Sequence, residues 1–310
     1  MPRNKAVDPN ALIFIDTNIL LDFYRIRKSD ISLKYLAEIE RHKAIIITSS
    51  QVEMEFKKNR QSVILESIGE VKKIISINTS VPALLANALP AKMIVKFKRD
   101  LEKQQKKLRA RIENVLKRPN VYDPVFKSLQ KIFQNKCEIN LNRENELRFR
   151  IRKLAFRRFF LGYPPRKKND TSIGDAINWE WIIHCAKTTN KNVIVVTRDT
   201  DYGAVYGDDS YLDDWLSKEF RERTNNRRRL ILTEKLSKAF ELVNIPDTQD
   251  MIDEETQLIG LTGNDADKDS DIYDVIKKIG ARTDISDVIT DSAIKLIKRK
   301  WNNLTPKEKK

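Results

Sequence analysis

The chain has 310 residues, of which 40% are hydrophobic and 33% charged, and its formal net charge is +15. This length allows one large domain or two smaller ones with a substantial core. No apolar run approaches the roughly 20 residues of a membrane span, and two cysteines, Cys137 and Cys185, support neither a disulfide framework nor a thiolate metal site. We therefore expect a cytoplasmic protein without a membrane partner, and the positive charge indicates a polyanion such as nucleic acid.

A buried strand is predicted at Leu12 to Ile15, where four apolar residues rich in isoleucine follow one another. The run ends in Asp16, Thr17 and Asn18. A carboxylate at the C-terminal end of a central strand lies where open α/β sheets place their active sites. An aspartate here is also typical of a turn or a helix cap, so a catalytic role requires other acids at matching places.

A helix, a buried strand at 44–48 and a second helix from about residue 51 follow this motif. Val52 and Phe56 share one face of the second helix, which predicts that its first turn is anchored in the core. Glu55 lies beside that face, close to the C-terminal edge of the predicted sheet. Glu53 is the alternative acid, and we prefer Glu55 for its spacing from Val52.

The middle of the chain, from 61 to about 166, is predicted to be helical, with 74–77 as its one candidate strand. Residues 91–170 hold 24 Lys and Arg against 8 Asp and Glu, an excess of 16 positive charges. Apolar residues at helical spacing predict a long amphipathic helix at 91–116 with a basic outer face. We interpret the segment as a helical insertion that binds nucleic acid; a solvated hairpin that only packs on the core is the alternative. The arginines expected to contact phosphate, interleaved with phenylalanines, are Arg150, Arg152, Arg157 and Arg158.

Beyond a proline-containing loop, a helix from about Ile173 carries Asp175 in its first turn. A strand at 192–197 then leads into Asp199, and a fourth strand is predicted at 229–233. Alternating strands and helices favour a mainly parallel sheet covered on both faces. After Pro246 the composition becomes acidic and irregular, and a small basic helix is expected at 287–301.

Four acids, each at the end of a strand or in a first helical turn, can converge on one edge of such a sheet: Asp16, Glu55, Asp175 and Asp199. Carboxylates packed together repel one another, and a cation normally neutralises them. Oxygen ligands without histidine or cysteine favour Mg²⁺ or Mn²⁺, ions that serve phosphodiester cleavage by coordinating phosphate oxygens and activating water. Four unrelated capping or surface acids are the alternative.

Four short motifs follow one another in the chain: Phe14-Ile15-Asp16-Thr17-Asn18, Val52-x-x-Glu55, Gly174-Asp175-Ala176-Ile177 and Val196-Thr197-Arg198-Asp199. In these motifs the chain resembles the PIN-domain nucleases. In Gln51-Val52-x-x-Glu55-Phe56-Lys57-Lys58-Asn59-Arg60, Gly174-Asp175-x-x-x-Trp179 and Leu216-x-x-Glu219-Phe220 it resembles a bacterial subgroup of PIN-like proteins with a long insertion. The resemblance implies an α/β fold, a three-layer α/β/α sandwich with a mainly parallel central sheet. It also implies metal-dependent ribonuclease activity, with the four acids as the metal ligands. We therefore expect a PIN-like nuclease domain at 1–246, with a helical insertion at about 61–168, and an acidic linker and helical tail at 247–310.

Supporting roles are predicted for Asn18, Thr197 and Asp201, with Asp170 as a further candidate. Asn18 could hold Asp16 or a metal-bound water, or simply cap the next helix. Thr197 could likewise orient an acid or a water. Arg60 could contact a phosphate as a bidentate donor; a solvated helix arginine is the alternative.

We predict an endoribonuclease acting on single-stranded or structured RNA. A DNA nuclease of the related flap-cleaving type is one alternative, because a metal–carboxylate site does not itself choose RNA over DNA. The other is a catalytically silent nucleic-acid-binding module, which the retention of all four acids disfavours. The chain could form a homo-oligomer, and no sequence feature identifies a protein partner.

Overall fold

The computed structural model describes residues 8–26, 28–75, 83–85, 87–166, 172–207 and 209–263. By its internal contacts the chain divides into two units, Met1–Leu258 and Ile259–Lys310. The strands are β1 (Leu12–Ile15), β2 (Ile46–Ser49), β3 (Asn140–Leu141), β4 (Val193–Val196), β5 (Gly203–Tyr206), β6 (Asp209–Leu212) and β7 (Leu230–Thr233). The α-helices are α1 (Thr17–Asp22), α2 (Ser29–Arg41), α3 (Ser50–Ile75), α4 (Leu89–Lys117), α5 (Pro119–Tyr122), α6 (Pro124–Phe133), α7 (Leu147–Phe160), α8 (Gly174–Thr189), α9 (Asp214–Arg223), α10 (Leu236–Leu242) and α11 (Gln249–Gly263). Three short 3₁₀ helices are η1 (Lys43–Ile45), η2 (Ala83–Leu85) and η3 (Thr200–Tyr202).

The centre of the fold is a five-stranded sheet in the order β3-β2-β1-β4-β7, and every pairing in it is parallel. Every residue of β1, β2 and β4 is buried, which explains why these strands read as continuous apolar runs. From β1 the chain builds the sheet outward in one direction to β2 and β3, and then in the other to β4 and β7. The switch point between β1 and β4 is where sheets of this kind bind ligands.

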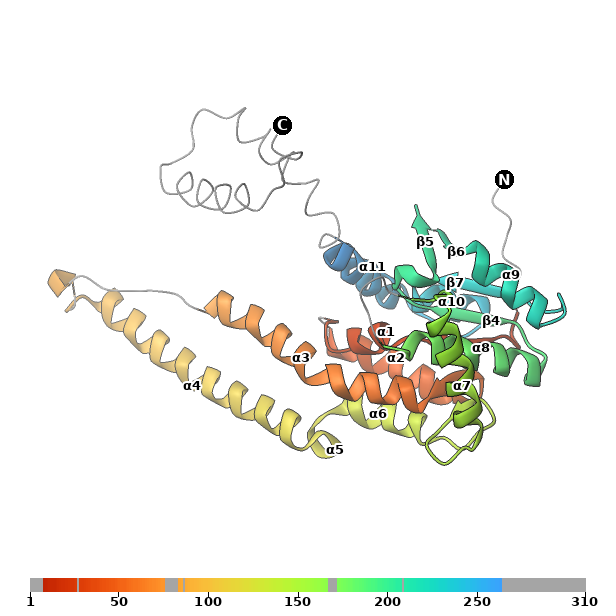
Figure 1. Ribbon diagram of the computed structural model, residues 1–310. Coiled ribbons are helices and arrows are strands. Elements are labelled where there is room, and N and C mark those ends of the chain that lie inside the picture. The colour runs from red at the N-terminus through yellow and green to blue at the C-terminus, as the bar shows by residue number, and fades with distance from the viewer. Residues whose placement is uncertain are drawn as a thin grey trace, which may run out of the picture. The chain divides into compact units, whose positions relative to one another are not determined.

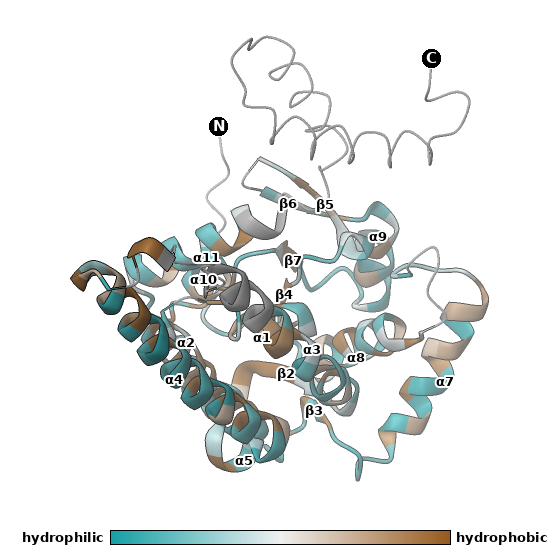
Figure 2. Ribbon diagram, turned by 90° about the vertical axis from the view of Figure 1, so that its left-hand side faces the viewer, coloured by the Kyte–Doolittle hydropathy of each residue, from teal (hydrophilic) through white to brown (hydrophobic). Residues whose placement is uncertain are grey.

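Helices cover both faces of this sheet (Figures 1 and 2). On one face α2 and α10 meet through Tyr35 and Phe240, whose ring centroids are 5.9 Å apart. On the other face α8 meets α9 through Trp179 and Phe220, at 6.3 Å. The predicted three-layer α/β/α sandwich is therefore confirmed.

The predicted insertion contributes more to the core than its sequence indicated. It contains β3, which pairs with β2 and was not predicted, because a strand of two residues has no periodic pattern. It also contains α6, whose apolar side chains, among them Leu129 and Phe133, are buried in the core. The candidate strand at 74–77 is wrong for Ile74 and Ile75, which end α3, while 76 and 77 lie outside the described residues.

Helix α4 is the long amphipathic helix expected from the sequence, with 29 residues. Figure 2 shows hydrophilic and hydrophobic residues alternating along it. Its apolar side chains stay largely exposed, with Phe97 62% and Met93 45% accessible, and Ala91 is its one buried residue.

Helix α11 occupies part of the segment expected to be an irregular linker. Met251 is buried, and the Glu255 carboxylate accepts hydrogen bonds from the backbone N–H groups of Leu236 and Ser237 at 2.5 and 3.0 Å. This carboxylate caps the N-terminus of α10, which ties α11 to the domain. The helix predicted at 287–301 lies outside the described residues.

Candidate metal centre

The carboxylate of Asp16 lies at the switch point, directly after β1. The β1–β4 register brings it beside Thr197, whose Oγ1 donates a hydrogen bond to Asp16 Oδ2 at 2.5 Å. Asn18 Nδ2 donates to the same oxygen at 3.1 Å, and the Thr17 backbone N–H donates to Oδ1 at 2.6 Å. Three donors from two strand ends therefore hold Asp16 in one orientation.

Asp16 is only 6% exposed, and this burial raises the pKa of its carboxyl from 3.8 to about 6. The negative charges of Glu55 and Asp199 raise it further, while the hydrogen bonds from Thr197 and Thr17 lower it. Ionising Asp16 is therefore costly unless a cation is bound nearby.

Glu55 reaches the same edge from the first turns of α3. Its Oε2 accepts a hydrogen bond from Thr17 Oγ1 at 3.0 Å, and its Oε1 accepts one from Gln51 Nε2 at 2.6 Å. Glu53 instead forms an ion pair with Lys57 at 2.6 Å. This geometry favours Glu55 over Glu53.

Gly174, the first residue of α8, leaves the space that the Glu55 carboxylate fills. A Cβ atom at this position would lie 2.2 Å from Glu55 Oε1 and 2.9 Å from Gln51 Nε2. The glycine therefore lets an acid from α3 approach the N-terminus of α8, where the helix dipole favours negative charge. Asp175 follows in the first turn of the same helix.

Asp199 follows β4 as the N-cap of η3 and Asp201 lies within η3, and both are next to Asp175. One carboxylate oxygen from each of these three residues can be chosen so that all lie within 4.8 Å of one another. The Asp199 backbone N–H donates to Thr197 Oγ1 at 2.9 Å, so one threonine orients the backbone of Asp199 and the side chain of Asp16. Asp201 is as well placed to hold a metal ion as Asp175 and Asp199, whereas only a supporting role was expected for it.

Three further residues of this centre were not predicted from the sequence: Gln51 and Thr17, which hold Glu55, and Tyr202. Tyr202 is fully buried, and burial together with the charges of Asp175, Asp16, Asp199 and Glu55 raises the pKa of its phenol well above its ordinary value. The tyrosine therefore lies close enough to all four predicted acids for their charges to act on it. No pattern marks it in the sequence, where it reads only as an aromatic residue after a strand.

Two predicted phosphate contacts are instead part of the protein interior. Arg60 is 3% exposed and pairs with Asp123 at 2.5 Å. Arg158 is 4% exposed and pairs with Glu180 at 3.1 Å and with Glu219. Both guanidinium groups are therefore committed to buried carboxylates, and neither lies where a nucleic acid could reach it.

The remaining predicted contacts, Arg150, Arg152 and Arg157, are exposed on α7. Phe149, Phe156 and Phe160 of the same helix are also exposed, by 61%, 60% and 80%. Helical spacing of phenylalanines more often indicates core, so this exposure strengthens the surface interpretation. Asp170 lies outside the described residues.

A family model for the PIN domain matches residues 13–202, a span that holds every acid of this centre. No curated protein and no solved structure matches the chain. None of the helices in the described part of the chain has both the length and the apolar composition of a membrane span. Because the match covers more than half of the 310 residues, the chain belongs to the PIN-domain family, whose members are generally nucleases.

Proposed function

We propose that this protein is an endoribonuclease that uses Mg²⁺ or Mn²⁺ to cleave single-stranded or structured RNA. The observation that carries the proposal is the convergence of Asp175, Asp199 and Asp201 within 4.8 Å, beside the buried Asp16. All these donors are carboxylate oxygens, the ligands that hard divalent ions prefer. A bound ion would polarise the scissile phosphate and lower the pKa of an attacking water.

The chain's own residues prepare the centre for such an ion. Thr197 and Asn18 fix the direction of the Asp16 carboxylate, and Thr17 and Gln51 do the same for Glu55. Outer partners of this kind hold ligands in place and tune the affinity for metal. Asn18 Oδ1 is buried and accepts no hydrogen bond from a described residue, so it is suited to accept one from an ordered water.

The exposed face of α7 supports a substrate path toward the acids. Helix α7 runs antiparallel to α8: Arg150 and His184 line one pocket, while further along α7 Arg158 pairs with Glu180. Following α7 from Arg150 toward Phe160 therefore leads toward the N-terminus of α8, which carries Asp175. Arginine and exposed phenylalanine side by side suit single-stranded RNA, because they neutralise phosphates and stack on unpaired bases.

The test is cleavage of end-labelled RNA, of DNA of the same sequence and of a branched (flap) DNA by the purified protein in Mg²⁺, Mn²⁺ or EDTA. We expect internal cleavage of RNA with either ion and none in EDTA. Preferential cleavage of branched DNA would show that the substrate is flap-type DNA and not RNA. Binding of either nucleic acid without cleavage in any ion would leave a silent binding module. The assignment to the cytoplasm stays a prediction.

A further inference from the structure

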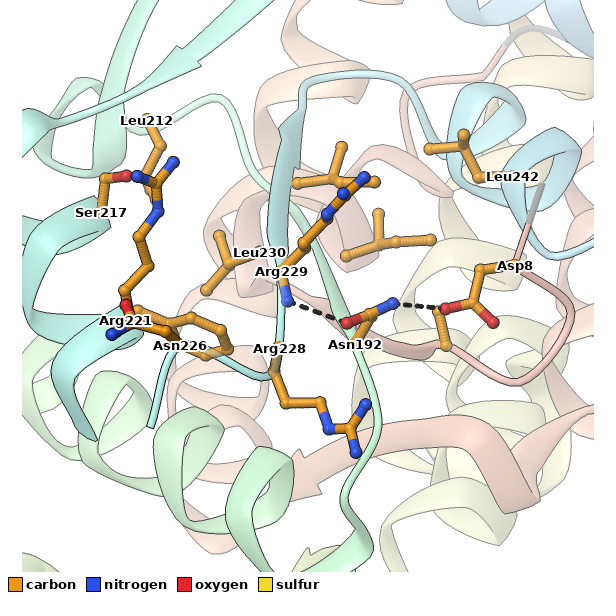
Figure 3. A pocket seen from close by; sticks show the side chains of 14 residues that line it. Asp8, Asn192, Leu212, Ser217, Arg221, Asn226, Arg228, Arg229, Leu230 and Leu242 are labelled. Carbon is orange, nitrogen blue, oxygen red and sulfur yellow. Dashed lines mark hydrogen bonds between the residues drawn. The ribbon is translucent and has the colours of Figure 1, made fainter. Parts of the chain in front are cut away.

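A second candidate site lies at the N-terminal ends of the parallel strands, opposite the acids at their C-terminal ends. It is a cavity of about 600 Å³ around the start of β7 (Figure 3). Ala11 and Asn192, which line it, precede β1 and β4, whereas Asp16 and Thr197 follow these strands. Five residues of extended chain separate the two edges, roughly 16 Å. A ligand in this cavity therefore does not touch the metal centre.

The wall of the cavity is held by a chain of hydrogen bonds that joins three strand starts. Asn192 Nδ2 donates to Asp8 Oδ2 at 2.7 Å, and Asn192 Oδ1 accepts from the Arg229 backbone N–H at 2.8 Å. Figure 3 shows both bonds. Nearby, Arg228 Nε donates to Asn190 Oδ1 at 2.8 Å. Because loops before β1, β4 and β7 are tied together in this way, the cavity is preformed.

The charge of the cavity is strongly positive. Arg221, Arg228 and Arg229 line it, and none of the three forms an ion pair within the described residues. Asp8 is the one carboxylate in the lining, and both of its oxygens already accept hydrogen bonds, from Asn10 N and Asn192 Nδ2. In Figure 3 the side chains of Arg221 and Arg229 flank Leu230. Guanidinium groups that line one cavity without a carboxylate partner among the described residues suit a multivalent oxyanion such as phosphate.

The rest of the lining is apolar, including Ile194, Leu230, Ile231 and Leu242, with the amide of Asn226 and the hydroxyl of Ser217 at its margin. A bare inorganic anion would leave these apolar walls in contact with water. The volume is in the range of small-molecule sites, which combine apolar walls with a few polar groups that fix orientation. The complementary ligand is therefore an organic phosphate with a flat, weakly polar body.

We propose that this cavity binds a nucleoside phosphate, with Arg221 and Arg229 holding the phosphates and the aliphatic wall holding the base. The site is separate from the proposed RNA cleavage and does not depend on it. It gives the protein a place to sense a small nucleotide at the far edge of the sheet.

The test is calorimetric titration of the full chain in EDTA, which keeps the metal centre out of the measurement. The probes are ATP, AMP, adenosine and pyrophosphate. We expect ATP and AMP to bind with micromolar Kd. Adenosine and pyrophosphate should bind at least about 10-fold more weakly, because adenosine has no phosphate for the arginines and pyrophosphate has no base for the apolar wall. Pyrophosphate that binds as tightly as ATP would reduce the cavity to an anion site and overturn the proposal.

The decisive variant is Arg221→Gln with Arg229→Gln, and the matched control is Lys218→Gln with Arg227→Gln. All four side chains are exposed and come from the same two segments, but the control pair does not line the cavity. We expect the first pair to weaken ATP binding at least about 10-fold and the control pair to leave it within about 2-fold. Equal losses in both pairs, no ATP binding at millimolar concentration, or displacement of ATP by a single-stranded RNA oligonucleotide with equal effectiveness would contradict a nucleotide site.

Discussion

At the scale of single residues, Asp16 places a cost on the metal-free protein. Burial raises the pKa of this carboxyl from 3.8 to about 6, so the folded chain keeps a proton that the unfolded chain has already lost. Stability therefore falls as the pH rises from about 4 to about 6, by about 3 kcal/mol at most for a shift of this size.

Replacing the charge should remove that cost. In EDTA at pH 7, Asp16→Asn should unfold at a higher urea concentration than the parent protein, by about 1 kcal/mol or more in unfolding free energy; losing acceptors for Thr197 and Asn18 offsets part of the gain. At pH 4 the advantage should disappear. Equal stability of the two proteins at pH 7 would mean that the buried charge is not costly.

Substitution of Gly174 should affect activity much more than stability. In Gly174→Ala the new Cβ would meet the tips of Glu55 and Gln51, which are flexible, and not the backbone. Unfolding free energy should change by less than about 1 kcal/mol, because alanine also suits a helix better than glycine. Displacing Glu55 should lower metal affinity and cleavage rate by roughly 10- to 100-fold. Gly260→Ala in α11, where nothing lies within 4 Å of the added Cβ, is the matched control; it should raise the unfolding free energy by no more than about 1 kcal/mol and leave metal affinity and cleavage rate unchanged.

The same residues show where sequence reasoning reaches its limit. Asp16, Glu55, Asp175 and Asp199 were predictable, because each follows an apolar run or opens a helix at the edge of a parallel sheet. Arg60 was misassigned, because its partner Asp123 lies 63 residues away and no local pattern pairs them. A buried arginine and a solvated one look alike in a helix until the partner carboxylate is known.

At the scale of elements, the Arg60–Asp123 pair joins α3 to the cap of α6. The Asp123 Oδ1 accepts from the Phe126 backbone N–H at 2.9 Å, while its Oδ2 accepts from Arg60 and from the Tyr24 hydroxyl. Asp123→Asn should destabilise the protein by about 3–5 kcal/mol, because it leaves a buried guanidinium without its charge partner. Urea unfolding measures the loss. A loss below about 1 kcal/mol would contradict the structural role assigned to Arg60.

Variants of helix α7 distinguish a nucleic-acid-binding surface from a face that is only solvated. Replacing Arg150, Arg152 and Arg157 together by glutamine should raise the KM for RNA more than it lowers kcat. It should also flatten the slope of log K against log salt, which is about −0.7 for each phosphate contacted on a single strand. Fluorescence anisotropy with a labelled RNA across a salt series gives both affinity and slope.

The matched control removes three exposed cations from α2 and η1 instead, as Lys34→Gln, Arg41→Gln and Lys43→Gln. It changes the net charge equally but lies on the opposite helical layer. If the control flattens the salt slope as much as the α7 variant does, α7 is only one part of a generally basic surface. Arg158 is left intact in both variants, because its buried pairing with Glu180 would confuse a binding defect with a folding defect.

The elements also explain which parts of the fold were predictable. Apolar runs marked β1, β2, β4 and β7 within one or two residues at each end. The hairpin of β5 and β6 was missed, because three of the four residues of β5 are exposed and β6 alternates exposed and half-buried residues over only four positions. The hairpin meets the sheet mainly through the contact of β6 with β7, so little apolar pattern was needed to form it.

At the scale of the whole molecule, one parallel sheet presents two chemically opposite edges. The C-terminal ends of β1 and β4 gather carboxylates, and the N-terminal ends of β1, β4 and β7 gather uncompensated arginines. This separation follows from topology, because parallel strands bring all of their C-terminal loops to one side. The proposed nuclease activity uses the acidic ends of the strands and not the arginine-lined cavity at their other ends.

The most direct test of that activity is digestion of a covalently closed single-stranded RNA, which has no ends, by the parent protein and by Asp199→Asn. In Mg²⁺ the parent protein should produce linear RNA, and in EDTA it should produce none. The Asp199→Asn protein should be slower by at least about 100-fold, because even changes to the outer partners of metal ligands cost 10- to 100-fold. Cleavage that persists in EDTA, or an Asp199→Asn protein as fast as its parent, would contradict a metal-dependent endoribonuclease at this cluster of acids.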